Sequence, residues 1–297
     1  MFVPLAAQSA TFPVLYYLAG LTCNEDTGAW KGNFLAHAQA YGIALVFPDT
    51  SPRGANVEGE EDNWNLGTGA SFYVDATASK WEKNYRMYTF LTQELPTLLK
   101  GLNLPLVCAI LFTFVPFHIL DLHSDNLLSL QDLNRQSIMG HSMGGMGALN
   151  LFLSTSQYRS ASAFAPACNP TTSPWGINAF TNYLKGGIEE GEKYDPSCLL
   201  RKAKGRSGVN ILIDYGDADE FYLGGNLSPE VFQQTADEAG FTREDVNIRR
   251  HAGYDHGYYF VRAVVIDGYC SDITLRFQIS TFAEDHVKCK EIFIPNT

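Results

Sequence analysis

The sequence has little positive charge and no basic run. Its 21 Lys and Arg residues are outnumbered by 32 Asp and Glu residues, so the formal net charge is −11. Proteins that hold a phosphate backbone normally cluster positive charge, so we expect no nucleic-acid partner. Only 18% of the residues are charged and 45% are hydrophobic, which excludes wholesale disorder and predicts a packed globular protein.

The sequence also lacks paired cysteines. Its six cysteines are scattered, without a CxxC pair or the ligand spacing of a zinc site. A chain of 297 residues can bury a core without disulfides, so we expect free thiols and a reducing compartment. The first residues do not show the basic segment and apolar stretch of a secretory signal. These absences predict a cytoplasmic protein without a metal site.

One long uncharged segment is an exception to the mixed composition. Residues 101–120, GLNLPLVCAILFTFVPFHIL, contain no charged side chain and are about long enough to cross a bilayer. Pro105 and Pro116 would break a membrane helix, and His118 lies inside the segment. We therefore expect no membrane partner.

Continuous apolar runs alternate with stretches that suit helices. The runs occupy residues 14–18, 43–47, 137–139, 160–164 and 209–215, and the helical stretches occupy residues 30–41, 85–100, 145–153 and 229–239. Strands covered on both faces have such continuous runs. The alternation predicts an α/β protein with a mostly parallel sheet, helices on both faces, and its chemistry in loops at the carboxyl ends of the strands.

A candidate nucleophile lies in the pentapeptide 140–144, GHSMG. It fits the G-x-S-x-G pattern, with a short apolar run before it and a helical stretch after it. A sharp strand-to-helix turn would expose the Ser142 hydroxyl, and a Cβ at Gly140 or Gly144 would collide with backbone in so tight a turn. The competing interpretation is a structural glycine-rich turn.

A serine nucleophile needs an acid and a base, which follow it along the chain in this arrangement. Asp217 and Asp219 both follow the run 209–215, and these residues alone do not separate them, whereas Asp214 lies inside the run and is expected to be structural. His256, in the turn GYDHG, is the predicted base, and His251 is the alternative. His141 is expected to point away from the nucleophile.

The oxyanion formed in acyl transfer needs two backbone donors. Met143, after the nucleophile, supplies one N–H, and Leu21 in the loop after the run 14–18 is the expected second donor. Cys23 would then lie near the pocket; the alternative is an inert buried thiol.

Several blocks of the sequence resemble the S-formylglutathione hydrolase (esterase D) family. They span most of residues 13–260: YYLAGLTC (16–23), VFPDTSPRG (46–54), GASFYVDAT (69–77), YRMYTFLTQELP (85–96), RQSIMGHSMGGMGAL (135–149), SAFAPACNPTTSPWG (162–176) and GYDHGYYF (253–260). DTSPRG and GYDHGYYF are far more specific than G-x-S-x-G.

The resemblance implies an α/β-hydrolase fold and a serine thioesterase that splits S-formylglutathione into glutathione and formate in formaldehyde detoxification. It implies Ser142 as nucleophile, Asp219 as acid, His256 as base, and Leu21 and Met143 as oxyanion donors. It also implies a pocket role for Trp175, for which a core aromatic is the alternative. A homodimer without a cofactor is implied as well.

The chain departs from the family pattern at three places. The match to the family begins almost at Met1, so the family's first antiparallel strands are expected to be absent. The segments near 103–127 and 262–278 are expected to be insertions into a single domain that spans residues 1–297. The second insertion follows His256 closely and could displace it. A broad short-chain carboxylesterase and an inactive binding protein of the same fold are the competing functions.

Overall fold

The computed structural model describes residues 1–3, 12–101 and 131–271. The helices and strands follow one another along the chain as β1 (Phe12–Leu18), α1 (Glu25–Lys31), α2 (Phe34–Tyr41), β2 (Ala44–Val46), α3 (Met87–Thr89), the π-helical turn η1 (Phe90–Glu94), α4 (Leu95–Gly101), β3 (Gln131–His141), α5 (Met143–Ser154), β4 (Ala161–Phe164), α6 (Pro174–Tyr183), α7 (Gly187–Gly191), α8 (Pro196–Lys202), β5 (Ile211–Gly216), α9 (Glu220–Leu223), α10 (Pro229–Ala239), β6 (Val246–His251) and α11 (Tyr258–Ser271).

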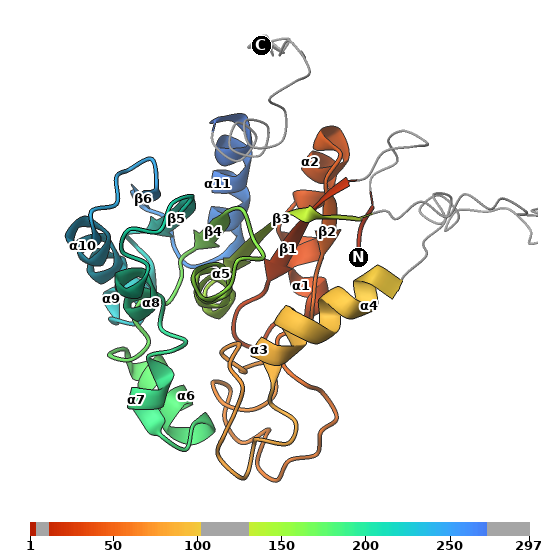
Figure 1. Ribbon diagram of the computed structural model, residues 1–297, viewed down its shortest axis with the longest axis vertical. Coiled ribbons are helices and arrows are strands. Elements are labelled where there is room, and N and C mark those ends of the chain that lie inside the picture. Colours follow the sequence, from red (N-terminus) through yellow and green to blue (C-terminus); the bar gives the residue numbers. More distant parts are fainter. Residues whose placement is uncertain (4–11, 102–130, 272–297) are drawn as a thin grey trace, which may run out of the picture.

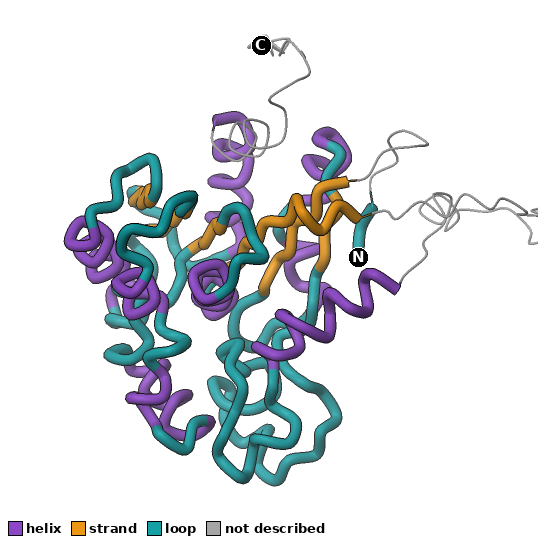
Figure 2. Tube along the Cα trace, in the orientation of Figure 1, coloured by secondary structure: helices purple, strands orange, loops and turns teal. Residues whose placement is uncertain are grey.

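The six strands form one sheet in the order β2-β1-β3-β4-β5-β6, and every neighbouring pair is parallel. Figure 2 shows this sheet as a layer between helices. Figure 1 shows the long segment between β2 and α3 together with α6 and α7 at the lower end of the molecule, below the carboxyl ends of the strands. The predicted α/β architecture is confirmed.

Each face of the sheet carries its own hydrophobic cluster, because neighbouring side chains of a strand point to opposite faces. Val14, Tyr16 and Leu18 pack with α5, α8 and α10. Leu15 and Tyr17 pack with α2 and α11 on the other side. This two-sided burial explains why β1 reads as a continuous apolar run.

The predicted runs and helical stretches all overlap elements of the structure, but helices α6, α7, α8 and α9 were not predicted. The stretch 30–41 is two helices, since Asn33 between α1 and α2 has a left-handed backbone with φ 57°. Strand β6 was not predicted, and only Val246 of its six residues is buried.

Two further predictions concern the unusual segments. The insertion near 103–127 and most of the uncharged segment 101–120 lie outside the described residues. Residues 262–271 of the second insertion continue α11 without a break. In the part of the chain that the structure describes, no helix is both long and apolar enough to span a bilayer.

Candidate active site

The candidate nucleophile lies at the sharp turn between β3 and α5. Ser142 has φ 58° and ψ −121°, a conformation that costs a non-glycine residue on the order of 1 to 3 kcal/mol. Its N–H donates to the carbonyl of Phe164 on β4 at 2.8 Å. The sheet and the wholly buried first turns of α5 hold this strained residue at the carboxyl end of a central strand.

The glycines on both sides of Ser142 are required by close backbone contacts. A Cβ on Gly140 would lie 2.2 Å from the carbonyl oxygen of Gly144, and a Cβ on Gly144 would lie 2.0 Å from the carbonyl oxygen of Leu18. Such separations are far below van der Waals contact. The predicted collisions are therefore confirmed, and they fix the turn against the end of β1.

Asp219 and His256 form a close pair although they are far apart in sequence. The Oδ2 atom of Asp219 lies 2.6 Å from Nδ1 of His256, and the Asp219 side chain is buried. Its other oxygen, Oδ1, accepts hydrogen bonds from the backbone N–H groups of Phe221 and Tyr222 at 2.8 and 3.2 Å. The carboxylate thus caps α9 and orients the imidazole at the same time.

The competing acids have other partners. Asp217 accepts from the N–H of Gly253 at 2.7 Å and lies 3.2 Å from an Arg250 nitrogen. Asp214, which was expected to be structural, is fully buried, accepts both hydrogen bonds of the Arg249 guanidinium, and lies 2.7 Å from Nε2 of His251. The described residues therefore contain two Asp–His pairs, and Asp219 with His256 is the pair beside the Ser142 turn.

The loop that contains His256 contacts the turn at Ser142 through His141. The Nε2 atom of His141 lies 3.0 Å from the carbonyl oxygen of His256, and their rings are 4.7 Å apart. Sequence reasoning placed His141 away from Ser142 and missed this contact with that loop. Among the described residues no hydrogen bond joins the Ser142 hydroxyl to the His256 ring; such bonds are often long without substrate.

The loop after β1 lies directly against the nucleophile. A Cβ on Gly20 would be 3.1 Å from the Cβ of Ser142. The N–H groups of Leu21 and Met143 donate to no acceptor in the described ranges of the chain. The oxyanion role predicted for these two groups thus competes with no hydrogen bond to the backbone of the described residues.

The loop DTSPRG (residues 49–54) is hydrogen-bonded to the loop that follows β1. The carbonyl of Cys23 accepts hydrogen bonds from the Thr50 hydroxyl and, at 2.9 Å, from the Arg53 guanidinium. The N–H of Thr22 donates to the carbonyl of Gly69 at 2.9 Å. The Cys23 side chain is partly exposed and packs against the cluster on the α2 and α11 face.

An aromatic wall leads from the surface to the imidazole. It consists of Trp64, Trp175 and Phe221, with ring centroids 5.5 Å apart between the tryptophans and 4.5 Å apart between Trp175 and Phe221. Phe221 meets the His256 ring edge to face at 4.6 Å. Trp64 is half exposed. Phe221 therefore lies between Trp175 and the His256 ring, a contact that the sequence pattern did not reveal.

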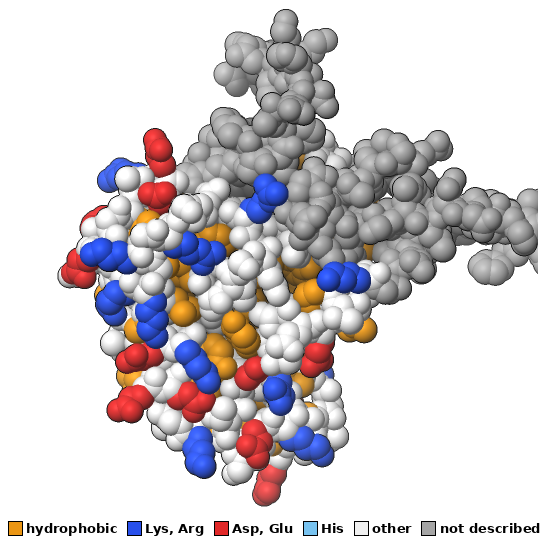
Figure 3. Space-filling model, viewed as in Figure 1, with side chains coloured by type: hydrophobic (Ala, Val, Ile, Leu, Met, Phe, Trp, Pro, Cys, Tyr) orange, Lys and Arg blue, Asp and Glu red, His pale blue; other side chains and the backbone are white. Residues whose placement is uncertain are grey.

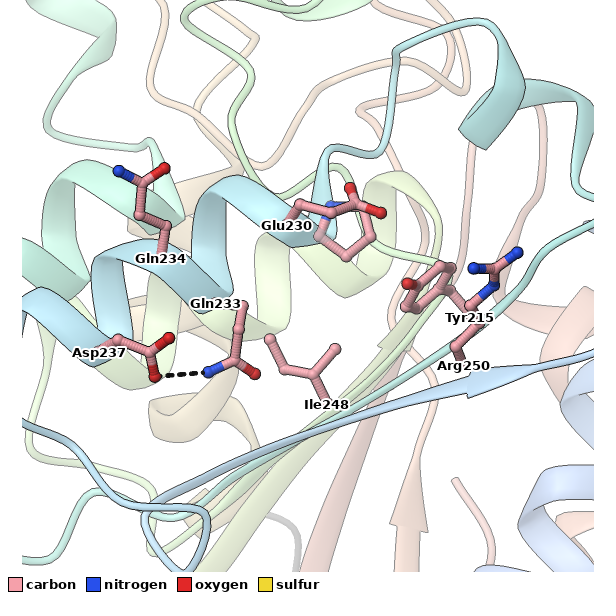
Figure 4. A pocket seen from close by; sticks show the side chains of 8 residues that line it. Tyr215, Glu230, Gln233, Gln234, Asp237, Ile248 and Arg250 are labelled. Carbon is pink, nitrogen blue, oxygen red and sulfur yellow. Dashed lines mark hydrogen bonds between the residues drawn. The ribbon is translucent and has the colours of Figure 1, made fainter.

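A separate hollow of about 350 Å³ lies between α10 and strands β5 and β6 (Figure 4). None of the candidate site residues lines it; its lining is Tyr215, Pro229, Glu230, Gln233, Gln234, Asp237, Ile248 and Arg250. Glu230 accepts a hydrogen bond from the Tyr222 hydroxyl at 2.6 Å. Tyr222 also donates its N–H to Asp219. The hollow is therefore linked to α9 through Tyr222, but it lies outside the candidate site.

Comparisons with known proteins assign the chain to a family. The family profile named Esterase matches residues 1–103 and 113–268. S-formylglutathione hydrolase of Mus musculus is 41% identical over 268 residues, which cover 90% of this chain and 84% of the relative. The chain belongs to the S-formylglutathione hydrolase family. The relative from Arabidopsis thaliana is 41% identical over 287 residues, covering 96% of this chain and 84% of the relative.

A solved structure supports the same assignment. The S-formylglutathione hydrolase of Agrobacterium tumefaciens superposes with a TM-score of 0.76 at 34% identity, covering 93% of this chain and 87% of that structure. The α/β-hydrolase fold expected from the family resemblance is thereby confirmed. The blocks that carried the resemblance lie around the site: DTSPRG holds Cys23, and GYDHGYYF contains His256.

Proposed function

We propose that this chain hydrolyses S-formylglutathione to glutathione and formate, with Ser142 as nucleophile, His256 as base and Asp219 as orienting acid. The observation that carries the proposal is the 2.6 Å contact between Asp219 and His256 beside the strained Ser142 turn in a member of this family. In formaldehyde detoxification, this reaction would release the formyl group of S-formylglutathione as formate.

Acylation is the first half of the reaction. His256 accepts the Ser142 proton as the hydroxyl oxygen bonds to the formyl carbon. Asp219 accepts the Nδ1–H hydrogen bond, which leaves Nε2 free to take that proton and stabilises the imidazolium. The Leu21 and Met143 N–H groups bind the oxyanion. The carbon–sulfur bond then breaks, and the departing thiolate takes the proton back from the imidazolium, so that His256 is neutral before deacylation.

Deacylation repeats the sequence with water. His256 removes a proton from a water molecule, whose oxygen attacks the formyl ester of Ser142. The ester bond breaks, formate leaves, and the imidazolium returns its proton to the serine oxygen. In the preceding acylation step the leaving group is a thiolate, which is a good leaving group, so that step needs less acid assistance than the corresponding step of an amidase.

The pocket assignments are part of the proposal. Trp64, Trp175 and Phe221 form the wall along which the thioester approaches His256, and Cys23 borders the loop that carries Leu21. Substitution by alanine should raise KM most at Phe221, less at Trp175 and least at Trp64, because these rings lie successively farther from the imidazole along the wall. Equal KM values for the three variants would contradict this order.

Purified protein tests the function directly. We expect it to release thiol from S-formylglutathione with a larger kcat/KM than it shows for p-nitrophenyl acetate, and to be labelled at Ser142 by a fluorophosphonate. Ser142→Ala should abolish both activities. A clear preference for the ester would favour a broad carboxylesterase, and a folded protein that is not labelled would favour a binding protein.

The expectation of a homodimer comes from the family resemblance, and the expectation of a cytoplasmic location comes from the scattered cysteines. We propose a homodimer in the cytoplasm, formed by one domain that includes both inserted segments. Sedimentation velocity at micromolar concentration checks the dimer, for which a monomer is the contradicting result.

A further inference from the structure

One buried ring beside the site takes no part in the reaction described above. His141 is 5% exposed. Its ring lies 4.7 Å from the His256 ring and 5.2 Å from the Tyr258 ring. It is therefore packed between the nucleophile turn and the loop that carries the base.

The hydrogen bond of His141 defines its tautomer. A carbonyl oxygen only accepts, so the 3.0 Å contact with the His256 carbonyl requires the hydrogen on Nε2. Nδ1 then carries a lone pair, is buried, and has no partner among the described residues. It faces the loop after β1, because a Cβ on Gly20 would lie 3.6 Å from it. Both ring nitrogens thus point at segments that build the site.

The surroundings keep this ring uncharged. Burial lowers the pKa of His141 well below its ordinary value, and the neighbouring His256 ring lowers it further. The titratable groups in ring contact with it are His256 and Tyr258, and no carboxylate contacts it within the described ranges. The imidazolium that forms on His256 during acylation therefore meets a neutral neighbour.

We propose that His141 is a positioning residue for His256, which it holds at the nucleophile turn through the Nε2–H bond to the His256 carbonyl. This rests on the proposed function. His256 is then fixed at two points, its ring by Asp219 and its main chain by His141. Because His141 and Ser142 are adjacent in sequence, the bond sets the separation of base and nucleophile. Misplacement of a reacting group by 1 Å can lower the rate on the order of 100-fold.

Two substitutions separate the hydrogen bond from the packing. His141→Gln retains an N–H donor at the ε position, whereas His141→Leu fills similar space without one. We expect the leucine variant to lose about 10- to 100-fold in kcat with little change in KM, and the glutamine variant to recover most of that loss. Circular dichroism and the melting temperature show whether each variant is folded.

Two results would overturn the proposal: a folded leucine variant with wild-type kcat, or equal losses in both variants. Each variant is assayed with S-formylglutathione and with p-nitrophenyl acetate. A wild-type chain that hydrolyses only the ester contradicts the proposed function and leaves the His141 comparison intact. A chain that turns over neither substrate contradicts both.

A spectroscopic readout reports on His141 without any turnover. In nitrogen-15 spectra of the full chain, the His141 signals, assigned by their loss in His141→Gln, should show the neutral Nε2–H tautomer throughout about pH 5 to 8. A His141 ring that protonates in this range, or that carries its hydrogen on Nδ1, would overturn the proposal even if the leucine variant is slow.

Discussion

The two oxygens of Asp219 have separate tasks. Oδ1 caps α9, and Oδ2 contacts Nδ1 of His256, the proposed base. Asp219→Asn retains an acceptor for the cap, but its amide N–H donates to His256 and so favours the wrong imidazole tautomer. We expect kcat to fall about 10⁴-fold with the fold intact, as for the equivalent change in serine proteases. Steady-state kinetics and circular dichroism check both parts.

Asp217→Asn is the matched control. This carboxylate binds Gly253 and Arg250 and not the His256 ring, so its loss of charge should reduce kcat by less than about tenfold. If Asp217→Asn were the more damaging change, the acid assigned to the triad would be the wrong one.

The burial of His141 predicts a pH effect on stability. Its pKa is lowered in the folded state, so the folded protein binds fewer protons than the unfolded chain once the pH falls below about 6.5. The contribution of His141 to the free energy of unfolding is therefore complete above that pH. Below it, this contribution declines by at most about 1.4 kcal/mol per pH unit.

His141→Gln should remove this decline. Urea unfolding at about pH 7 and about pH 5 would then show a smaller difference in the free energy of unfolding for the variant than for the wild type. An unchanged difference would mean that His141 does not contribute to the acid sensitivity.

At the scale of elements, an ion cluster joins β5 to the edge strand β6. Arg249 of β6 donates two hydrogen bonds to the buried Asp214 of β5. Arg249→Met would leave that carboxylate with the His251 contact alone among the described residues, and we expect a loss of about 3 kcal/mol in the free energy of unfolding.

The neighbouring arginine provides the comparison. Arg250 pairs with Asp217 at the surface, and its side chain is 60% exposed, so Arg250→Met should cost less than about 1 kcal/mol. Urea denaturation of both variants measures the contrast. Equal losses would contradict the assignment of the Asp214 cluster as a structural link.

Strand β6 also shows where sequence reasoning stops. The strands β1 and β5 were predictable because both faces are covered and their runs are continuously apolar. Within the described ranges β6, with the sequence VNIRRH, pairs with one neighbour, and most of its residues are partly exposed, so its pattern resembles a polar loop. Its register comes from the pairing with β5, which no local pattern encodes.

The candidate site divides in the same way. Ser142 and His256 lie in short motifs that carry their own glycine geometry, and they were predictable. The choice between Asp217 and Asp219 depends on which side chain faces a loop 37 residues further along the chain, and only the resemblance favoured Asp219. The contacts of His141, Phe221 and Arg53 depend wholly on tertiary packing.

At the scale of the whole molecule, the sheet connects the two hydrophobic clusters. Leu149 on α5 and Leu15 on β1 lie on opposite faces and are both buried. Leu149→Ala and Leu15→Ala should each lower the free energy of unfolding by about 2 to 5 kcal/mol. Because the clusters share the same strands, each variant should unfold in one transition, measured by near- and far-ultraviolet circular dichroism together. Separate transitions would indicate that the two layers are independent.

Helix α5 is buried from Met143 to Leu153. No local fraying can expose its amides to solvent, so their hydrogen exchange should require the opening of the entire sheet. The candidate nucleophile Ser142 thus directly precedes a helix that we expect to exchange slowly, whereas Trp64 at the entrance is half exposed. Substrate preference can therefore drift through changes at the entrance while the backbone that carries Ser142 stays fixed.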